Sequence, residues 1–320
     1  MDLIHSTMNL LLPPIILISL LLILPPYLIY KFALLIIKPF CVEDVTGKVV
    51  IITGASSGIG ENIAYEYAKR GARLVLVARR EKKLKEVAEK ARGLGSPDVL
   101  IVCADVSIVD DCKRFIDETI NHFGQLDHLV NNAGIISAYY FEETMDIATS
   151  RTLMDINFWG SVYPTHFAIP HLKKSKGKLI VNTSLAGWLY GPDISFYGAS
   201  KAALINLYDT LRVELGSEIG ITIVSPGFTE SEMSEGKHLS KDGVVEINEE
   251  LRDAVVGLFP VRGVRECSKA IVRGICRGDR CVTDPSYYRI LYVCKVFFPE
   301  IVEWFFWMLF VRKPETKKLS

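Results

Sequence analysis

The feature that most constrains this chain is an alternation, between residues 45 and 285, of short apolar runs and helix-like segments. The apolar runs read KVVIITG, RLVLVAR, VLIVCADV, LDHLVNNAG, GKLIVNTS and GITIVSPG. Such runs separated by helices are typical of βαβ units, whose parallel strands are covered on both faces. With right-handed crossovers, the alternation predicts an α/β fold with a doubly wound parallel sheet of the Rossmann type.

A glycine-rich turn follows the first run. In TGASSGIG the glycines precede a helix that we expect to begin at Glu61. Glycines at such a turn let the backbone approach a pyrophosphate, and the helix N-terminus supplies free N–H groups. A structural glycine turn is the alternative, but the strand–turn–helix context favours a dinucleotide site. The turn predicts cofactor contacts at Gly54, Ala55, Ser56, Ser57, Gly58, Ile59 and Gly60.

The end of the second run indicates which dinucleotide binds. An NAD site usually carries an acid there, which binds the ribose 2′-hydroxyl. Here the run ends VLVARRE, with Arg79 and Arg80 and no carboxylate before them. Arginines attract a 2′-phosphate, so the sequence predicts NADP(H). The alternative is a solvated basic helix start, especially for Arg80.

Tyr197 and Lys201 stand four positions apart in SFYGASKAAL, so they share one face of a helix. A phenol has a pKa of about 10, and an exposed ion pair contributes at most about 1 kcal/mol to shifting it. A partly desolvated lysine beside an oxidised nicotinamide ring has a larger effect, which makes Tyr197 a candidate general acid and base. A packed tyrosine with a snorkelling lysine is the alternative.

Several short motifs together carry a family resemblance. TGASSGIG, NNAG at 131–134, INFWG with Asn157, NTS with Ser184, YGASK and SPG at 225–227 occur in this order. In order and spacing they resemble the short-chain dehydrogenase/reductase family over residues 45–285. With this resemblance, the catalytic interpretation of Tyr197 and Lys201 is favoured over that of a packed tyrosine with a snorkelling lysine. The reaction that the resemblance implies is the interconversion of a hydroxyl and a carbonyl group.

The resemblance also implies site roles. Ser184 would orient the substrate oxygen, Tyr197 would exchange its proton, and Asn157 would hold a water that relays it. Lys201 would bind the nicotinamide ribose and depress the pKa of Tyr197. The remaining cofactor contacts implied are Asp105 and Val106 at the adenine, Asn131, Asn132, Ala133 and Gly134 along the wall, and Pro226, Gly227 and Thr229 at the nicotinamide.

A closer resemblance links the proline-bearing N-terminus, FWG, ELG at 214–216 and the aromatic C-terminal segment to the plant 11-beta-hydroxysteroid dehydrogenase-like proteins, or steroleosins. That group implies an NADP-dependent hydroxysteroid dehydrogenase on seed oil bodies, acting on a steroid or sterol-like substrate. Two alternatives stay open: an enzyme for another lipid carbonyl, such as a long-chain keto-lipid, and a lipid-droplet surface protein with little catalysis.

Residues 1–40 predict a membrane anchor. No charge occurs from Met8 to Tyr30, a length that would span ~34 Å as one helix. The pairs Pro13-Pro14 and Pro25-Pro26 favour a hairpin or half-inserted anchor over a kinked single pass, and a secretory signal is weakly supported. Lys31 and Lys38 follow the segment, so we expect the large domain to face the cytosol, on the endoplasmic reticulum or an oil-body monolayer.

The remaining predictions concern domains and partners. Residues 41–285 would form the NADP-binding domain, and the aromatic segment 286–320 would be a pocket lid, an interfacial helix, a dimer contact or core. Its uncharged run Trp304–Val311 is too short to span a membrane, and 313–320 reads as a frayed tail. Equal totals of 37 basic and 37 acidic residues argue against nucleic acid. The seven cysteines are irregularly spaced, which indicates free thiols and not disulfides. The histidines have no ligand spacing with cysteines or carboxylates, so no metal site is predicted. The sequence leaves open whether the protein forms a homodimer.

Overall fold

The computed structural model describes most of the chain, namely residues 2–38, 42–144, 146–240, 243–247 and 260–310. It divides into two compact units, Met1–Glu43 and Asp44–Ser320. The unit boundary falls close to residue 40, where the sequence predicts the anchor to end. Each unit is described by itself below.

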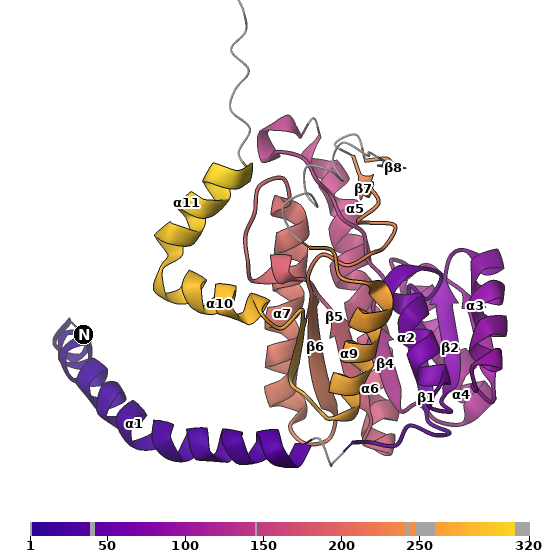
Figure 1. Ribbon diagram of the computed structural model, residues 1–320, viewed down its shortest axis with the longest axis horizontal. Helices are drawn as coiled ribbons and strands as arrows, with labels where there is room; N and C mark the ends of the chain where they lie inside the picture. Colours follow the sequence, from indigo (N-terminus) through magenta and orange to yellow (C-terminus); the bar gives the residue numbers. More distant parts are fainter. Residues whose placement is uncertain (1, 39–41, 145, 241–242, 248–259, 311–320) are drawn as a thin grey trace, which may run out of the picture. The chain divides into compact units, whose positions relative to one another are not determined.

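A parallel sheet organises the larger unit (Figure 1). Among the described residues it has seven strands in the order β3-β2-β1-β4-β5-β6-β9, and every neighbouring pair is parallel. The order reverses beside β1, which creates the switch point where α/β sheets bind ligands. The predicted doubly wound sheet is therefore confirmed. The strands are β1 (Val49–Thr53), β2 (Arg73–Ala78), β3 (Val99–Cys103), β4 (His128–Asn131), β5 (Lys178–Asn182), β6 (Gly220–Pro226) and β9 (Cys281–Asp284).

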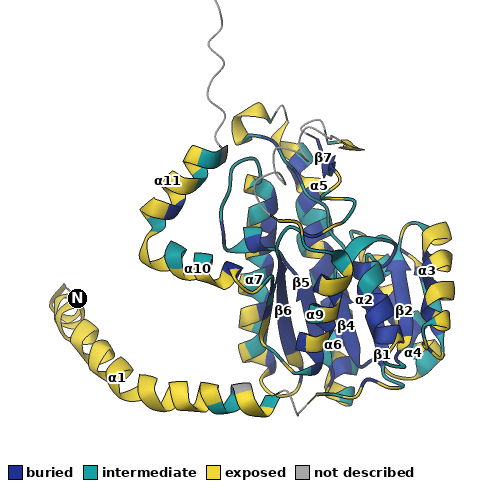
Figure 2. Ribbon diagram, viewed as in Figure 1, coloured by how far each residue is buried: buried dark blue, intermediate teal, exposed yellow. Residues whose placement is uncertain are grey.

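Helices cover both faces of this sheet, as a parallel sheet requires. Alternate residues of β1 point to opposite faces: Val50 and Ile52 join one buried cluster, and Val49 and Ile51 join the other. Figure 2 shows the strands buried between the helical layers. The first cluster includes residues of α2 (Gly58–Ala68), α3 (Glu81–Gly93) and α9 (Val264–Cys276), and the second includes residues of α4 (Val109–Phe123), α6 (Gly160–Ser175) and α7 (Ser195–Leu215).

Smaller elements lie between these helices and strands. The short helix α5 (Arg151–Met154) continues into a π-helical turn at Asp155–Trp159, which leads into α6. After β6, the strands β7 (Lys237–Leu239) and β8 (Val245–Ile247) pair in antiparallel fashion. Leu239 also donates from its N–H to the Ile136 carbonyl at 2.7 Å, which ties this hairpin to the loop after β4.

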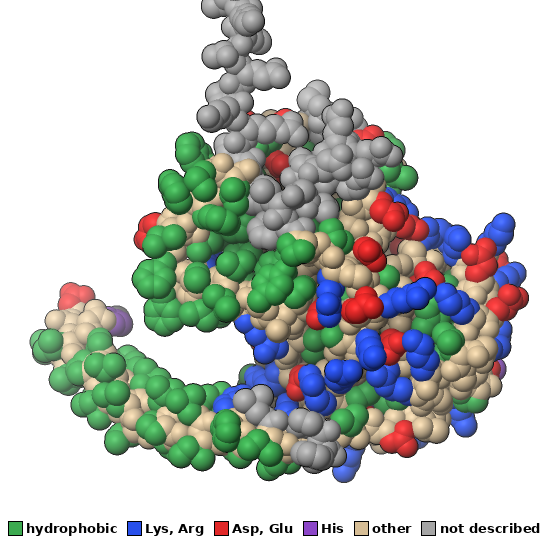
Figure 3. Space-filling view, viewed as in Figure 1, with side chains coloured by type: hydrophobic (Ala, Val, Ile, Leu, Met, Phe, Trp, Pro, Cys, Tyr) green, Lys and Arg blue, Asp and Glu red, His purple; other side chains and the backbone are tan. Residues whose placement is uncertain are grey.

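Two aromatic helices follow β9: α10 (Tyr288–Phe297) and α11 (Pro299–Phe310). Tyr288 and Val302 are buried, whereas the outward-facing Trp304 and Trp307 are 59% and 64% exposed. Hydrophobic side chains therefore gather over both helices in Figure 3. Core packing, one expectation for this segment, accounts for only part of it. Residues 311–320, which include the end of the predicted run Trp304–Val311 and the predicted frayed tail, lie outside the described residues.

The N-terminal unit contains one long helix, α1 (Asp2–Ile37), of 36 residues. Its most apolar window has a mean hydropathy of 2.3 and no buried residue, and the helix is long and apolar enough to cross a membrane. Both proline pairs lie inside the helix, so the predicted fold-back at the prolines is not observed. Proline removes a backbone hydrogen bond and bends a helix, and apolar helices accommodate this bend without ending. Figure 1 shows α1 as a continuous, curved helix.

Candidate active site

A cavity of about 600 Å³ opens at the carboxyl ends of the parallel strands. Its floor comes from the turn after β1 and the ends of β2, β4 and β5. The start of α7, the segment after β6 and one face of α10 and α11 complete the walls. The switch point of the sheet, the predicted glycine turn and the predicted tyrosine therefore meet in one cavity.

Tyr197 and Lys201 lie in the first two turns of α7 and line this cavity together. Tyr197 is 8% exposed and Lys201 is 4% exposed. The Lys201 Nζ lies 5.8 Å from the centre of the Tyr197 ring and donates to the Asn182 carbonyl at 3.0 Å. The structure thus brings the two buried side chains together on one face of α7, as the i, i+4 spacing predicts.

Burial dominates the titration of both groups. It raises the pKa of Tyr197, and a hydrogen bond to the Ser184 side chain acts in the opposite direction. Burial also lowers the pKa of Lys201 to about 8. The Lys201 ammonium is directed to the Asn182 carbonyl, and desolvation is the largest effect on the pKa of Tyr197. The depression of this pKa by Lys201, which the resemblance implies, stays a prediction.

Ser184 follows the last residue of β5, Asn182, by two positions and lines the same cavity. Its backbone is extended, and its Oγ accepts the Ala186 N–H at 3.2 Å at the start of a 3₁₀ turn, Leu185–Gly187. This cap fixes the hydroxyl beside the Tyr197 phenol, with which it interacts. Ser184 and Tyr197 thus present two adjacent hydroxyl groups to a ligand.

Asn157 lies in the π-helical turn and is completely buried. Its Oδ1 accepts the Ile135 N–H at 2.8 Å, and its Nδ2 donates to the Ile135 carbonyl at 2.9 Å and to the Ser200 Oγ at 3.0 Å. Ser200 in turn donates to the Tyr197 carbonyl at 2.8 Å. Both amide hydrogens are therefore occupied, and the side chain braces α7 against the loop after β4. Holding a relay water, the role implied by resemblance, stays a prediction.

Most of the predicted glycine turn lines the cavity, namely Gly54, Ser56, Ser57, Gly58 and Ile59. Ala55 and Gly60 do not. Ala55 is fully buried in the core, and a Cβ at Gly60 would lie 2.4 Å from the Gly54 carbonyl oxygen, so Gly60 serves the close packing of the turn. Ser57 is the N-cap of α2 and makes no side-chain capping bond to the described residues. The first N–H groups of α2 therefore remain available to an anion.

The opposite wall follows β3 and β4. Asp105, Val106, Asn132, Ala133 and Gly134 line the cavity, as predicted for cofactor contacts. Asn131 does not. Its Nδ2 reaches the Ser161 carbonyl at 3.1 Å and the Thr165 and Tyr208 hydroxyls at 2.9 Å each, so it links β4 to α6 and α7 beneath the site. The motif NNAG therefore divides between a structural asparagine and three residues that face the cavity.

The loop after β6 places Pro226, Gly227 and Thr229 on the cavity wall. Gly227 donates its N–H to the Asp284 carbonyl at 2.8 Å. A Cβ at Gly227 would lie only 2.6 Å from Cε2 of the buried Tyr288, so the first residue of α10 packs directly on this loop. Thr229 donates its hydroxyl to the Gly227 carbonyl at 3.2 Å.

Both predicted arginines line the cavity, with different partners. The Arg79 Nη1 lies 3.4 Å from an Asp105 carboxylate oxygen, and its side chain is 63% exposed. Arg80 reaches the Ser56 and Ser57 hydroxyls of the glycine turn. It also pairs with Glu232, which the sequence analysis did not single out, because a partner 152 positions away leaves no local signal.

The other end of the cavity is apolar. Its lining includes Leu189 and Tyr190, after the 3₁₀ turn, together with Leu291, Phe306 and Leu309 of α10 and α11. The segment after β6 contributes residues up to Val245. The C-terminal helices therefore carry a face that lines the pocket, one of the roles expected for this segment.

The chain is similar to known proteins in sequence and in fold. Residues 48–242 match the family model for short chain dehydrogenase, so the chain belongs to this family of oxidoreductases. It is 55% identical over 316 residues to 11-beta-hydroxysteroid dehydrogenase A of Arachis hypogaea, covering 99% of this chain and 90% of that protein. It is 51% identical over 304 residues to 11-beta-hydroxysteroid dehydrogenase 1A of Arabidopsis thaliana, covering 95% and 87%. The predicted family is confirmed.

Solved structures agree on the fold. A short chain dehydrogenase/reductase from Burkholderia phymatum, in complex with NAD, has a TM-score of 0.70 and 22% identity, covering 81% of this chain and 96% of that chain. A short-chain type dehydrogenase/reductase from Mycobacterium marinum has a TM-score of 0.65 and 26% identity, covering 75% and 94%.

Proposed function

We propose that this protein is an NADP(H)-dependent hydroxysteroid dehydrogenase, which interconverts a hydroxyl and a keto group on a steroid or sterol-like substrate. One observation carries the proposal: a single cavity holds the Ser184, Tyr197 and Lys201 side chains between an arginine-bearing end and an apolar end. Each end suits one of the two molecules that such a reaction brings together. The 11-beta-hydroxysteroid dehydrogenase names of the plant relatives support the same substrate class.

The chain's own residues account for the proton side of the reaction. Ser184 donates to the substrate oxygen, and Tyr197, beside it, gives that oxygen a proton in reduction and removes one in oxidation. A bound nicotinamide would supply or accept the hydride. The buried Lys201 binds a ribose hydroxyl and, as a cation, stabilises the phenolate that Tyr197 becomes after it has donated its proton. Asn157 holds α7 in place and acts as a positioning residue.

The glycine turn and the arginines support NADP(H) as the dinucleotide. The N–H groups at the start of α2 suit a pyrophosphate, and the wall containing Asp105 and Val106 suits an adenine. Arg79 and Arg80, which both line the cavity after β2, would then supply guanidinium groups for a 2′-phosphate, which accepts charge-assisted hydrogen bonds. Asp105 is the nearby acid, and its pairing with Arg79 at 3.4 Å is loose enough to leave that arginine exchangeable.

The apolar end supports a lipid substrate. Leu189, Leu291, Phe306 and Leu309 form a wall that suits a fused-ring or long-chain ketone and offers few polar partners. A long-chain keto-lipid would meet the same wall, so a different lipid carbonyl is the runner-up.

The exposed apolar helix α1 supports attachment to the endoplasmic reticulum or to a lipid droplet. Lys31 and Lys38 follow the apolar segment, and positive charges favour the cytosolic side, so the catalytic unit after them would lie in the cytosol. The proposal does not assign an oligomeric state, and a homodimer is compatible with it. A surface protein with little catalysis does not require a buried lysine, because burying a lysine without a catalytic use only destabilises the fold.

The test is NADPH oxidation by the purified full-length chain against a panel of steroid ketones and long-chain keto-lipids, with NADH as the comparison. We expect steroid-dependent oxidation of NADPH at a kcat/KM at least about tenfold above that with NADH, equivalent to one charge-assisted hydrogen bond. Turnover of keto-lipids alone would select the runner-up substrate, and no turnover of any ketone would contradict the enzymatic role.

A further inference from the structure

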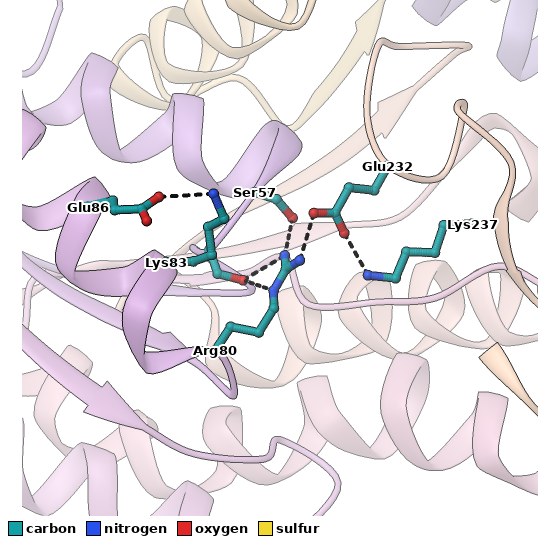
Figure 4. A network of polar contacts seen from close by, with 7 residues as sticks. Ser57, Arg80, Lys83, Glu86, Glu232 and Lys237 are labelled. Atoms are coloured by element: carbon teal, nitrogen blue, oxygen red, sulfur yellow. Dashed lines mark hydrogen bonds and ion pairs between the residues drawn. The ribbon is translucent and has the colours of Figure 1, made fainter. Parts of the chain in front are cut away.

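The Arg80 guanidinium lies between the hydroxyls of the glycine turn and a carboxylate (Figure 4). It donates from Nη2 to the Ser57 Oγ at 2.6 Å and to the Ser56 Oγ at 3.0 Å. Both serines belong to the glycine turn, so the guanidinium is fixed against the start of α2. On its remaining side, Nη1 forms an ion pair with the Glu232 Oε1 at 2.7 Å.

Glu232 reaches Arg80 from the opposite wall of the cavity. It belongs to the segment 231–240, SEMSEGKHLS, which follows β6 and includes β7. Its second carboxylate oxygen pairs with the Lys237 Nζ at 2.7 Å, and the Lys237 N–H donates to the Glu232 carbonyl at 2.9 Å. Glu232 and Lys237 therefore form a compact turn that presents one carboxylate oxygen to Arg80.

The same segment also covers the glycine turn. A Cβ built on Gly58 would lie 3.3 Å from the Ser231 Cβ, so Ser231 packs directly above the first residue of α2. Farther along, Leu239 is hydrogen-bonded to Ile136 and forms a bridge with Ser137, in the loop that follows NNAG. The segment thus spans from the nucleotide end of the cavity to the wall near its catalytic end.

We propose that Glu232 is an internal competitor for the 2′-phosphate site: its carboxylate and a cofactor 2′-phosphate exchange at Arg80, and that exchange releases segment 231–240. This inference rests on the proposed use of NADP(H). Because a phosphate offers more acceptor oxygens and more charge than a carboxylate, it replaces Glu232 at the same guanidinium and serine donors. A cofactor without a 2′-phosphate leaves the Arg80–Glu232 pair in place.

The exposure of the pair makes the exchange feasible. The Arg80 and Glu232 side chains are 40% and 36% exposed, and ion pairs at such positions contribute little to stability. Burial raises the pKa of Glu232, but hydrogen bonds from Arg80 and Lys237 outweigh this effect and lower it, so the carboxylate is charged at neutral pH. The ion pair therefore keeps the Glu232 carboxylate at Arg80 when no phosphate is bound, and it is weak enough for a phosphate to displace the carboxylate.

The test compares the full-length chain with Glu232→Gln, using 2′,5′-ADP as the phosphate-bearing probe and 5′-ADP as the probe without it. Calorimetry should show that Glu232→Gln binds 2′,5′-ADP about fivefold more tightly than the parent. This gain in affinity is the size expected when an exposed ion pair no longer competes with the ligand. Binding of 5′-ADP should stay unchanged. Glu230→Gln is the matched control, since Glu230 is exposed and outside the cavity lining.

Hydrogen exchange provides a second measurement, independent of turnover. In the parent, 2′,5′-ADP should speed the exchange of the amides of residues 233–239, while 5′-ADP should not. In Glu232→Gln these amides should exchange rapidly without any ligand. Equal 2′,5′-ADP affinities and equal exchange in the parent and Glu232→Gln would overturn the competition. So would a loss of 5′-ADP affinity in Glu232→Gln, which would make Glu232 an acceptor for the ribose 2′-hydroxyl.

The two proposals can fail separately. If the parent and Glu232→Gln both bind 5′-ADP as tightly as 2′,5′-ADP, the NADP(H) assignment itself is wrong. If the parent prefers 2′,5′-ADP but Glu232→Gln is indistinguishable from it, the cofactor assignment stands and only the competition is rejected.

Discussion

The charged side chains at the two ends of the cavity differ in burial: the lysine at one end is buried, and the arginines at the other end are exposed. At the catalytic end, Lys201 is 4% exposed and its pKa falls to about 8, while burial raises the pKa of Tyr197. At the nucleotide end, the Arg79 and Arg80 side chains are 63% and 40% exposed and pair with carboxylates. Desolvation tunes proton affinity at the first end, whereas the second end offers charges whose partners exchange in water. Under the proposed function, burial therefore separates the groups that would react from the groups that would bind the nucleotide.

Replacing Tyr197 by Phe gives the largest expected separation of the two ends. The variant keeps the ring in its buried position and removes only the hydroxyl beside Ser184. Because general acid–base catalysis contributes at least about 100-fold, kcat should fall by that factor or more, with NADPH affinity unchanged. Initial rates and titration of cofactor fluorescence measure the two quantities. A variant as fast as the parent would remove Tyr197 from the proton transfer.

Lys201→Met sharpens the contrast by changing activity and stability in opposite directions. We expect kcat to fall at least about tenfold, since the buried cation is lost from the site. Burial depresses the folded-state pKa of Lys201 from 10.5 to about 8. This corresponds to roughly 3 kcal/mol, partly offset by the lost bond to Asn182, so the variant should be about 2 kcal/mol more stable at pH 7.

The pH dependence of that gain follows from linkage. Between pH 8 and 10.5 the unfolded parent binds more protons than the folded parent, so the parent's unfolding free energy rises with pH and the advantage of Lys201→Met shrinks. Chemical denaturation of the parent and variant at pH 7 and 10 checks the sign. Tyr197, whose folded pKa is raised, lowers stability only above pH 10 and does so in both proteins. An advantage that grows with pH would contradict a protonated Lys201.

Arg80→Gln tests the exposed end. The variant loses a charged donor fixed by Ser56 and Ser57, so NADPH should bind about tenfold more weakly, as for the loss of one charge-assisted hydrogen bond. NADH affinity and kcat at saturating NADPH should stay near the parent values, because the variant leaves the Tyr197 end intact. Steady-state kinetics with both cofactors separate these quantities. An equal loss for both cofactors would show that Arg80 supports the glycine turn and does not select a 2′-phosphate.

The smallest expected effect lies in the apolar wall. Phe306 lines the cavity, whereas its neighbour Phe305 is 41% exposed and does not line it. Phe306→Ala should raise the KM for an apolar ketone about threefold to tenfold, given the partial burial of a large side chain, and leave kcat unchanged. Phe305→Ala is the matched control and should behave as the parent in solution kinetics. Equal effects of the two substitutions would argue that α11 acts through its fold alone.

The sequence was sufficient to predict the sheet and the shared helix face of Tyr197 and Lys201, because their signals are local. The alternation of apolar runs follows directly from burial on two faces, and the Tyr197–Lys201 spacing follows from the helical repeat. The glycine turn was recognisable for the same reason, although Gly60 serves packing and Asn131 serves a buried network. Motif letters identified the right segments without showing which members face the cavity.

Other features depend on tertiary contacts. The Arg80–Glu232 pair joins residues 152 positions apart. In α11, residues 304–309 are all apolar, although only Phe306 and Leu309 among them line the cavity. The pKa of Tyr197 also depends on burial, which one spacing does not reveal. A helix continuous through the prolines of α1 was the less favoured alternative, because local helix-breaking by proline carried more weight than the strong apolarity of the flanking residues.

The contact between Gly227 and Tyr288 couples two parts of the enzyme that would otherwise evolve separately. A side chain at position 227 would require the Tyr288 ring, or α10 with it, to shift, because its Cβ would lie 2.6 Å from the Tyr288 Cε2. Exchanging α10 and α11 for those of another dehydrogenase should therefore succeed only if the donor helices bring a compatible aromatic ring to that glycine. Grafts that ignore this fit should alter hydride-transfer geometry together with ligand preference, so new specificities are easier to select within the existing helices than by replacing them.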